Sequence, residues 1–136
     1  MNKHDVIVRI VVEHYPAAQA IYLFGTYGTR DERPDSDVDI AVLLPPDQAR
    51  KEKNLLLSQC RLELEGALSK TVDLLNIRHV STVFQKEIIS GIRIYCSDPY
   101  AADEFEMLVI SYYQKLNEER QEILAAFFRT GRAYAV

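Results

Sequence analysis

The sequence is poor in cysteine, in long apolar runs and in excess positive charge, and each shortage excludes a class of protein. Its two cysteines, Cys60 and Cys96, have neither the spacing of a metal site nor that of a disulfide framework. We interpret them as small hydrophobic side chains of a cytoplasmic protein. The apolar run Ile7–Val12 is interrupted by Arg9 and is far too short to span a bilayer. No membrane segment is therefore expected.

The charge balance is acidic, with 20 Asp and Glu against 16 Lys and Arg and a formal net charge of −4. Long nucleic acid is not an expected partner, because binding it requires a basic face that neutralises phosphates. A nucleoside triphosphate remains compatible, since metal ions and a few arginines could balance its charge. Residues 1–5 contain no apolar core followed by a small-residue cleavage site, so no secretory signal is expected.

The length and the hydrophobic pattern predict one α/β domain over residues 1–136, without a linker or an internal repeat. The expected elements in chain order are a helix over 5–15, strands over 20–24 and 37–44, a helix over 47–68, a strand over 71–77, a short helix from 82 that ends before 91, a strand over 92–96 and a long helix within 97–130.

Capping residues define where the expected helices begin and end. Asp47 is the expected cap of the helix over 47–68, and Ser81 that of the short helix. Asp98 followed by Pro99 is a strong start for the final helix, and Gly131 is its expected end.

The final helix carries apolar residues at spacings of three, four and seven, a pattern typical of a face packed in a core. It is long for so small a domain, so its far end is a candidate docking surface for another chain. Tyr112 and Tyr113 are candidate contacts with such a partner. The residues of the apolar face are Phe105, Leu108, Tyr112, Leu116, Ile123 and Phe127.

Two acidic residues alternate with apolar ones in the strand predicted over 37–44. Strand side chains alternate between faces, so Asp37 and Asp39 point to the same side, about 6.6 Å apart along the backbone. Carboxylates in this arrangement can share two magnesium ions, which prefer hard oxygen ligands. The alternative is an edge strand with a solvated acidic face.

A third carboxylate, Asp73, lies inside the otherwise apolar strand over 71–77. An unpaired buried carboxylate is costly, so Asp73 requires a cation or an exposed strand end. If the two strands are neighbours, Asp73 completes a cluster with Asp37 and Asp39. It could then bind a metal ion and accept the proton of an attacking hydroxyl.

The first strand runs directly into Gly25 and Thr26. A glycine there lets the backbone approach a ligand, and the amides that follow can bind phosphate. A simple tight turn is the alternative. The spacing favours the functional interpretation, because ten residues separate this pair from Asp37.

Together these motifs resemble the nucleotidyltransferase superfamily that includes DNA polymerase β, whose members carry Gly-Ser, a spacer, Asp-x-Asp and a third carboxylate on a later strand. The resemblance covers nearly the whole chain and is strongest to the minimal nucleotidyltransferases. It implies a single-domain fold, with a small mixed sheet of about four strands flanked by helices and a long C-terminal helix.

The resemblance also implies residue roles. Gly25 and Thr26 would hold the triphosphate of ATP. The three carboxylates would bind magnesium, with two ions expected, and Asp73 would act as the base. Thr26 replaces the usual serine, which keeps the hydroxyl and adds a methyl group. The family's arginine position is occupied by Thr29, so Arg30 is the candidate replacement at the triphosphate.

More narrowly, the chain is similar to the MntA-type antitoxins that are paired with HEPN-domain toxins. This implies an antitoxin of a type VII-like pair that moves AMP from ATP to a tyrosine of a cognate HEPN RNase toxin and so neutralises it. Two alternatives stay open. A small-molecule nucleotidyltransferase, such as one that modifies an aminoglycoside, usually has an additional helical domain. A non-catalytic antitoxin that only covers the toxin has no need of three carboxylates.

Overall fold

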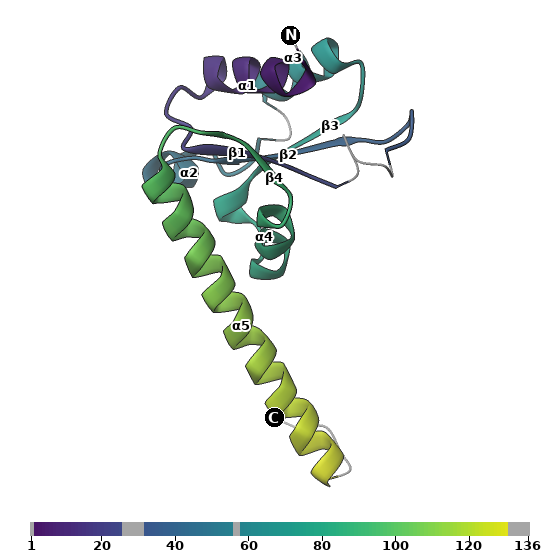
Figure 1. The fold of residues 1–136 in the computed structure, drawn as a ribbon, viewed down its shortest axis with the longest axis vertical. Coiled ribbons are helices and arrows are strands. Elements are labelled where there is room, and N and C mark those ends of the chain that lie inside the picture. Colours follow the sequence, from purple (N-terminus) through teal and green to yellow (C-terminus); the bar gives the residue numbers. More distant parts are fainter. Residues whose placement is uncertain (1, 26–31, 56–57, 131–136) are drawn as a thin grey trace.

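A computed structural model describes residues 2–25, 32–55 and 58–130 (Figure 1). Their elements are the helices and strands of an α/β domain. In chain order they are α1 (Lys3–His14), β1 (Ala20–Phe24), β2 (Val38–Leu43), α2 (Pro46–Lys51), α3 (Gln59–Leu68), β3 (Val72–Asn76), the 3₁₀ turn η1 (Ile77–His79), α4 (Thr82–Ile89), β4 (Ile92–Cys96) and α5 (Pro99–Thr130).

The strands form one mixed sheet in the order β3-β2-β1-β4. β1 pairs antiparallel with both β2 and β4, whereas β2 and β3 run parallel. Because side chains alternate between the two faces of a strand, the sheet has two apolar faces to cover. One packs against residues of α1 and α3, and the other against residues of α4 and the first part of α5. Figure 1 shows these layers on opposite sides of the sheet.

The single helix predicted over 47–68 is wrong: two helices, α2 and α3, occupy that range. Pro45, not Asp47, is the residue that precedes the first turn of α2. The chain leaves the helical path after Lys51, and Leu55 is buried in the core. Ser58 then starts α3, since its side chain accepts a hydrogen bond from the Arg61 amide. A second cap therefore competes with continuation of the first helix.

The predicted starts of α4 and α5 agree with the structure, whereas α1 begins at Lys3, two residues before its predicted start. The Ser81 side chain accepts a hydrogen bond from the Phe84 amide at the start of α4. Asp98 Oδ1 accepts one from the Ala101 amide at the start of α5, at 3.1 Å. Gly131, the predicted end of α5, lies outside the described residues. Within the described part of the chain, no helix has both the length and the apolar composition needed to cross a membrane.

The apolar face predicted for α5 is only partly a core face. Of its six residues only Phe105 is buried, together with its helix neighbours Ala102 and Val109. The core interpretation holds only for the beginning of the face, because α4, the helix that covers it, spans only Thr82–Ile89. Beyond α4, α5 extends away from the domain in Figure 1.

Polar contacts fix the first turns of α5 to the sheet. The Tyr22 hydroxyl on β1 donates a hydrogen bond to Glu106 Oε2 at 2.7 Å. Arg93 on β4 forms ion pairs with the same oxygen at 2.9 Å and with Asp103 Oδ1 at 3.0 Å. Burial and the neighbouring Glu106 raise the pKa of Tyr22, so the phenol stays a donor. α5 is thus joined to β1 and β4.

Candidate active site

Two of the predicted carboxylates, Asp39 on β2 and Asp73 on β3, lie side by side. The parallel register of these strands pairs their Cα atoms directly. Both residues are half-buried, and they occupy the sheet face that α4 and α5 cover. The neighbouring strands required by the sequence hypothesis are therefore present.

The third carboxylate, Asp37, immediately precedes β2 and is exposed. The strand predicted to begin there begins instead at Val38, whose amide donates to the carbonyl of Thr71 at 2.9 Å. Asp37 is nevertheless close enough to repel the charge of Asp39. It contributes to the same electrostatic site from its open edge.

The environment of Asp39 disfavours its charged form and raises its pKa to about 6. The largest cause is burial. Next come the charge of Asp73 and a hydrogen bond between the two carboxyls, followed by the charges of Asp37 and Glu87. Two neighbouring carboxyls that share a proton mark a place where a cation would relieve the repulsion.

The donor set fits a hard divalent cation in its chemistry, since it consists of carboxylate oxygens on adjacent strands. In the side-chain positions of the described residues, no three acidic, histidine or cysteine groups surround a single point closely enough to hold a metal. Asp39 and Asp73 already meet, whereas Asp37 stands further out. A metal ion held by all three carboxylates would thus require their side chains to rearrange.

Gly25, the residue after β1, touches Asp39. The antiparallel register pairs Phe24 with Asp39, which brings the residue that follows β1 against the carboxylate. A Cβ added at Gly25 would lie far inside contact distance of Asp39 Oδ2. The backbone φ of Gly25 is also +74°, a region that side chains rarely adopt. Glycine is required here both by conformation and by the carboxylate.

A hollow of about 220 Å³ opens beside Gly25, between the end of β1, the end of α4 and the start of β4. Glu87 on α4 lines it and is one of the charges that act on Asp39. Sequence reasoning missed Glu87, because nothing in its local pattern distinguishes it from a solvated helix residue. Its position becomes evident only when α4 packs on the sheet.

The segment that leads into Asp37 is held at its base by Lys70. Lys70 Nζ lies 3.4 Å from the carbonyl oxygens of Arg33 and Pro34 and 3.5 Å from that of Ser36. The Ser36 hydroxyl also accepts a hydrogen bond from the Arg33 amide at 2.8 Å. These contacts fix the backbone that places Asp37. Thr26 and Arg30, the other predicted nucleotide-binding residues, lie outside the described residues.

The comparisons with known proteins agree on one protein family. The profile described as "Polymerase beta, Nucleotidyltransferase" matches residues 7–100, a span that includes Gly25 and all three carboxylates. The chain is 32% identical over 118 residues to Protein adenylyltransferase MntA of Shewanella oneidensis, covering 87% of this chain and 82% of that protein.

Solved structures of similar chains extend the likeness to the fold. A crystal structure of a toxin-antitoxin with AMP-PNP matches with a TM-score of 0.69 and 32% identity, covering 94% of this chain and 99% of that chain. An antitoxin described as MNT, in complex with a tri-AMPylated Shewanella oneidensis HEPN toxin, matches with a TM-score of 0.64 and 31% identity, covering 93% and 96%. The fold predicted from the sequence is confirmed.

Proposed function

This chain belongs to the polymerase β-type nucleotidyltransferase family, and we propose that it is an antitoxin that transfers AMP from ATP to a tyrosine of a HEPN-domain toxin. The observation that carries the proposal is the meeting of Asp39 with both Asp73 and Gly25 at one end of the strands. A protein that only binds its partner gains nothing from a carboxylate pair that costs folding free energy.

The relatives support the proposed acceptor protein and the proposed nucleotide. One is named a protein adenylyltransferase, one was crystallised with AMP-PNP, and one is in complex with a tri-AMPylated HEPN toxin. AMP-PNP is an ATP analogue, and AMPylation is the attachment of AMP. Since this chain aligns with them over nearly its full length, we assign it the same substrate classes, ATP and a HEPN-domain protein.

Each site residue then has a role. Gly25 and Thr26 bind the triphosphate through backbone amides and a hydroxyl, and Arg30 is the candidate cation beside them. Asp37, Asp39 and Asp73 would hold magnesium, which offsets charge on the phosphates and on the attacking oxygen. The tyrosine oxygen bonds to the α-phosphorus, the bond to the β-phosphate oxygen breaks, and pyrophosphate leaves. Asp73 accepts the phenolic proton.

The experiment separates catalysis from stoichiometric binding. The cognate toxin is incubated with a substoichiometric amount of this chain and magnesium, with or without ATP. It is then purified under denaturing conditions and weighed by mass spectrometry. Added mass in units of AMP on many toxin molecules per antitoxin is the expected result. A toxin that stays unmodified, and is silenced only at equal stoichiometry without ATP, would make the chain a binding antitoxin.

An aminoglycoside in the same assay tests the small-molecule alternative. We expect no AMP transfer to it, because the described residues form no additional helical domain around the carboxylates. Transfer to the small molecule together with none to the toxin would refute the proposed acceptor.

A further inference from the structure

One side of α5 carries a stripe, a row of apolar side chains that is buried at its beginning, exposed further along and interrupted by the charged residues Glu119 and Arg120. Phe105 and Val109 are buried against α4 and the sheet. A helix turns by about 100° per residue, so residues separated by three, four, seven or eleven positions share a face. Tyr112, Leu116 and Ile123 continue this face, and Phe127 ends it. The stripe therefore prolongs the domain core into solvent.

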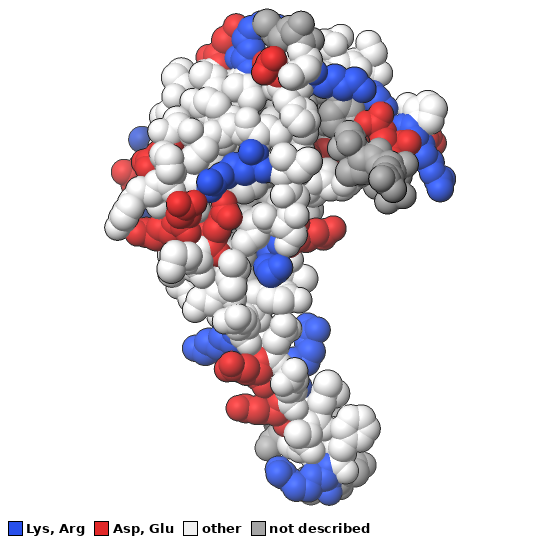
Figure 2. All heavy atoms as spheres, viewed as in Figure 1, with Lys and Arg blue, Asp and Glu red and all other residues white. Residues whose placement is uncertain are grey.

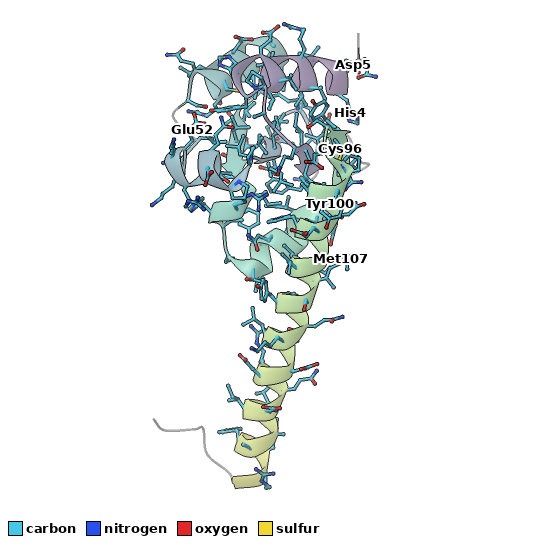
Figure 3. The ribbon with its side chains drawn as sticks, turned by 90° about the vertical axis from the view of Figure 1, so that its left-hand side faces the viewer. His4, Asp5, Glu52, Cys96, Tyr100 and Met107 are labelled. Atoms are coloured by element: carbon cyan, nitrogen blue, oxygen red, sulfur yellow. The ribbon has the colours of Figure 1, made fainter. Side chains whose placement is uncertain are left out.

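Among the described residues no helix or strand packs on the exposed part of the stripe, although Ala126, one residue before Phe127, is buried. Residues 114–130 extend roughly 25 Å at about 1.5 Å per residue. Figures 1 and 3 agree that no other described element lies beside this part of α5. The side chains of Leu116 and Ile123 are 42% and 53% exposed. Acidic and basic side chains flank the uncharged ones here (Figure 2). The surface is apolar without a strong charge of either sign.

A hollow of about 210 Å³ lies at the base of this stripe, between α4 and α5. Phe105, Val109 and Tyr112 form one wall, and Gln85 and Arg78 form the other. Hydrogen bonds to the Leu44 carbonyl and to Gln19 hold the Arg78 guanidinium over the Phe105 ring. These contacts hold the Arg78 side of the hollow in place, and well-packed pockets of this kind can receive an anchoring side chain at protein interfaces.

We propose that the docking face, formed by Tyr112, Leu116, Ile123, Phe127 and the hollow at their base, binds the HEPN-domain toxin. The inference rests on the proposed function and extends it, because it separates the surface that holds the substrate protein from the site that modifies it. An anchoring side chain of the toxin enters the hollow, and an apolar surface of the toxin covers the stripe.

The position of the docking face favours the substrate protein as its occupant. Asp39 and Asp73 occupy the same sheet face that α4 and α5 cover. A partner seated on the stripe therefore stands on the side of the sheet that carries the carboxylates. One protein can occupy the docking face and present a tyrosine to the site.

A second contact favours the toxin over a second copy of this chain. Four partly exposed apolar side chains contribute roughly 300–400 Å². This is a part of the about 1,200 Å² that a stable interface buries. The toxin adds a contact at the active site, which a second copy held only by the stripe does not.

The test compares two matched double variants of the full chain. Leu116→Glu/Ile123→Glu places two charges in the stripe. Gln114→Glu/Gln121→Glu places the same charges, at the same spacing of seven residues, on the opposite face of α5. Binding to an RNase-inactive cognate toxin is measured by calorimetry, and AMP transfer by mass spectrometry. Circular dichroism verifies that α5 stays helical, and Leu116→Ala/Ile123→Ala serves as a milder variant if the glutamates disturb folding.

We expect the stripe variant to raise the Kd for toxin at least about 30-fold, as fits the loss of two apolar contacts. Its affinity for ATP should stay unchanged, and the control variant should differ from the unmodified chain less than about threefold. Equal toxin binding by both variants would overturn the inference. So would a dimer of the chain alone that only the stripe variant disrupts.

The two proposals fail separately. If Asp39→Asn and the unmodified chain both bind toxin and neither modifies it, the proposed transfer is wrong and the docking face stands. If the stripe variant still binds and modifies toxin, the docking face is wrong and the transfer stands.

Discussion

Replacing Asp39 by asparagine should stabilise the metal-free protein while it abolishes AMP transfer. Burial and the neighbouring carboxyls raise the pKa of Asp39 from 3.8 to about 6. A pKa difference of one corresponds to about 1.4 kcal/mol, so ionising Asp39 costs the folded state up to about 3 kcal/mol. Solvent at this half-buried site screens the repulsion, and we expect about 1–2 kcal/mol.

The sign of the pH dependence follows from the direction of this pKa. A carboxyl whose pKa is raised in the folded state contributes stability that is present below about pH 4 and is lost as pH rises to about 6. The asparagine in Asp39→Asn cannot ionise, so this variant keeps that stability as the pH rises. The free-energy difference between variant and unmodified chain should therefore grow between pH 4 and 6 and stay constant above.

The assay is urea unfolding of both proteins in EDTA between pH 4.5 and 7.5, monitored by circular dichroism. Asp35→Asn is the control, since it removes an exposed carboxylate two residues before Asp37. Adding magnesium should stabilise the unmodified chain and have much less effect on Asp39→Asn. If Asp39→Asn is no more stable at pH 7 than the Asp35 control, the carboxylates do not repel one another as the structure indicates.

Two further substitutions test the other site residues. Asp73→Asn should lower the transfer rate by about 10²–10⁴, the usual range for a general base, with little change in nucleotide affinity. Rate measurements and titration with a fluorescent ATP analogue separate the two effects. Loss of ATP binding with high residual turnover would reverse the assigned roles. Gly25→Ala should displace the Asp39 carboxylate and strain a backbone φ of +74°, so the variant should lose transfer activity and about 1–3 kcal/mol of stability. Transfer near the normal rate, with unchanged urea unfolding, would mean that Gly25 is only a turn residue.

Local signals in the sequence were sufficient to predict the parts of the fold that depend on neighbouring residues. The strands over 20–24 and 92–96 have the predicted bounds, and Ser81 and Asp98 cap the helices that they were expected to cap. The adjacency of Asp39 and Asp73 required one non-local condition, a direct pairing of their strands, which the parallel register meets.

Features set by packing could not be predicted in this way. The break between α2 and α3 depends on burying Leu55, and the exposure of Leu116 depends on how far α4 reaches along α5. Glu87 becomes part of the site only because α4 lies beside the end of β1. In each case the deciding neighbour is distant in sequence, so periodicity around the residue does not report it.

The contacts that join α5 to the sheet also bear on which tyrosine of the toxin can be modified. Tyr22 lies three residues before Gly25 on the same stretch of chain, and its hydroxyl is bonded to Glu106 of α5. Arg93 joins the same turn of α5 to β4. These contacts hold the first turns of α5, where the docking face begins, at a constant distance from the carboxylates. A toxin bound to α5 would then present to the carboxylates only tyrosines at a matching distance from its own contact surface. The modified tyrosine would be selected by that distance rather than by the residues around it.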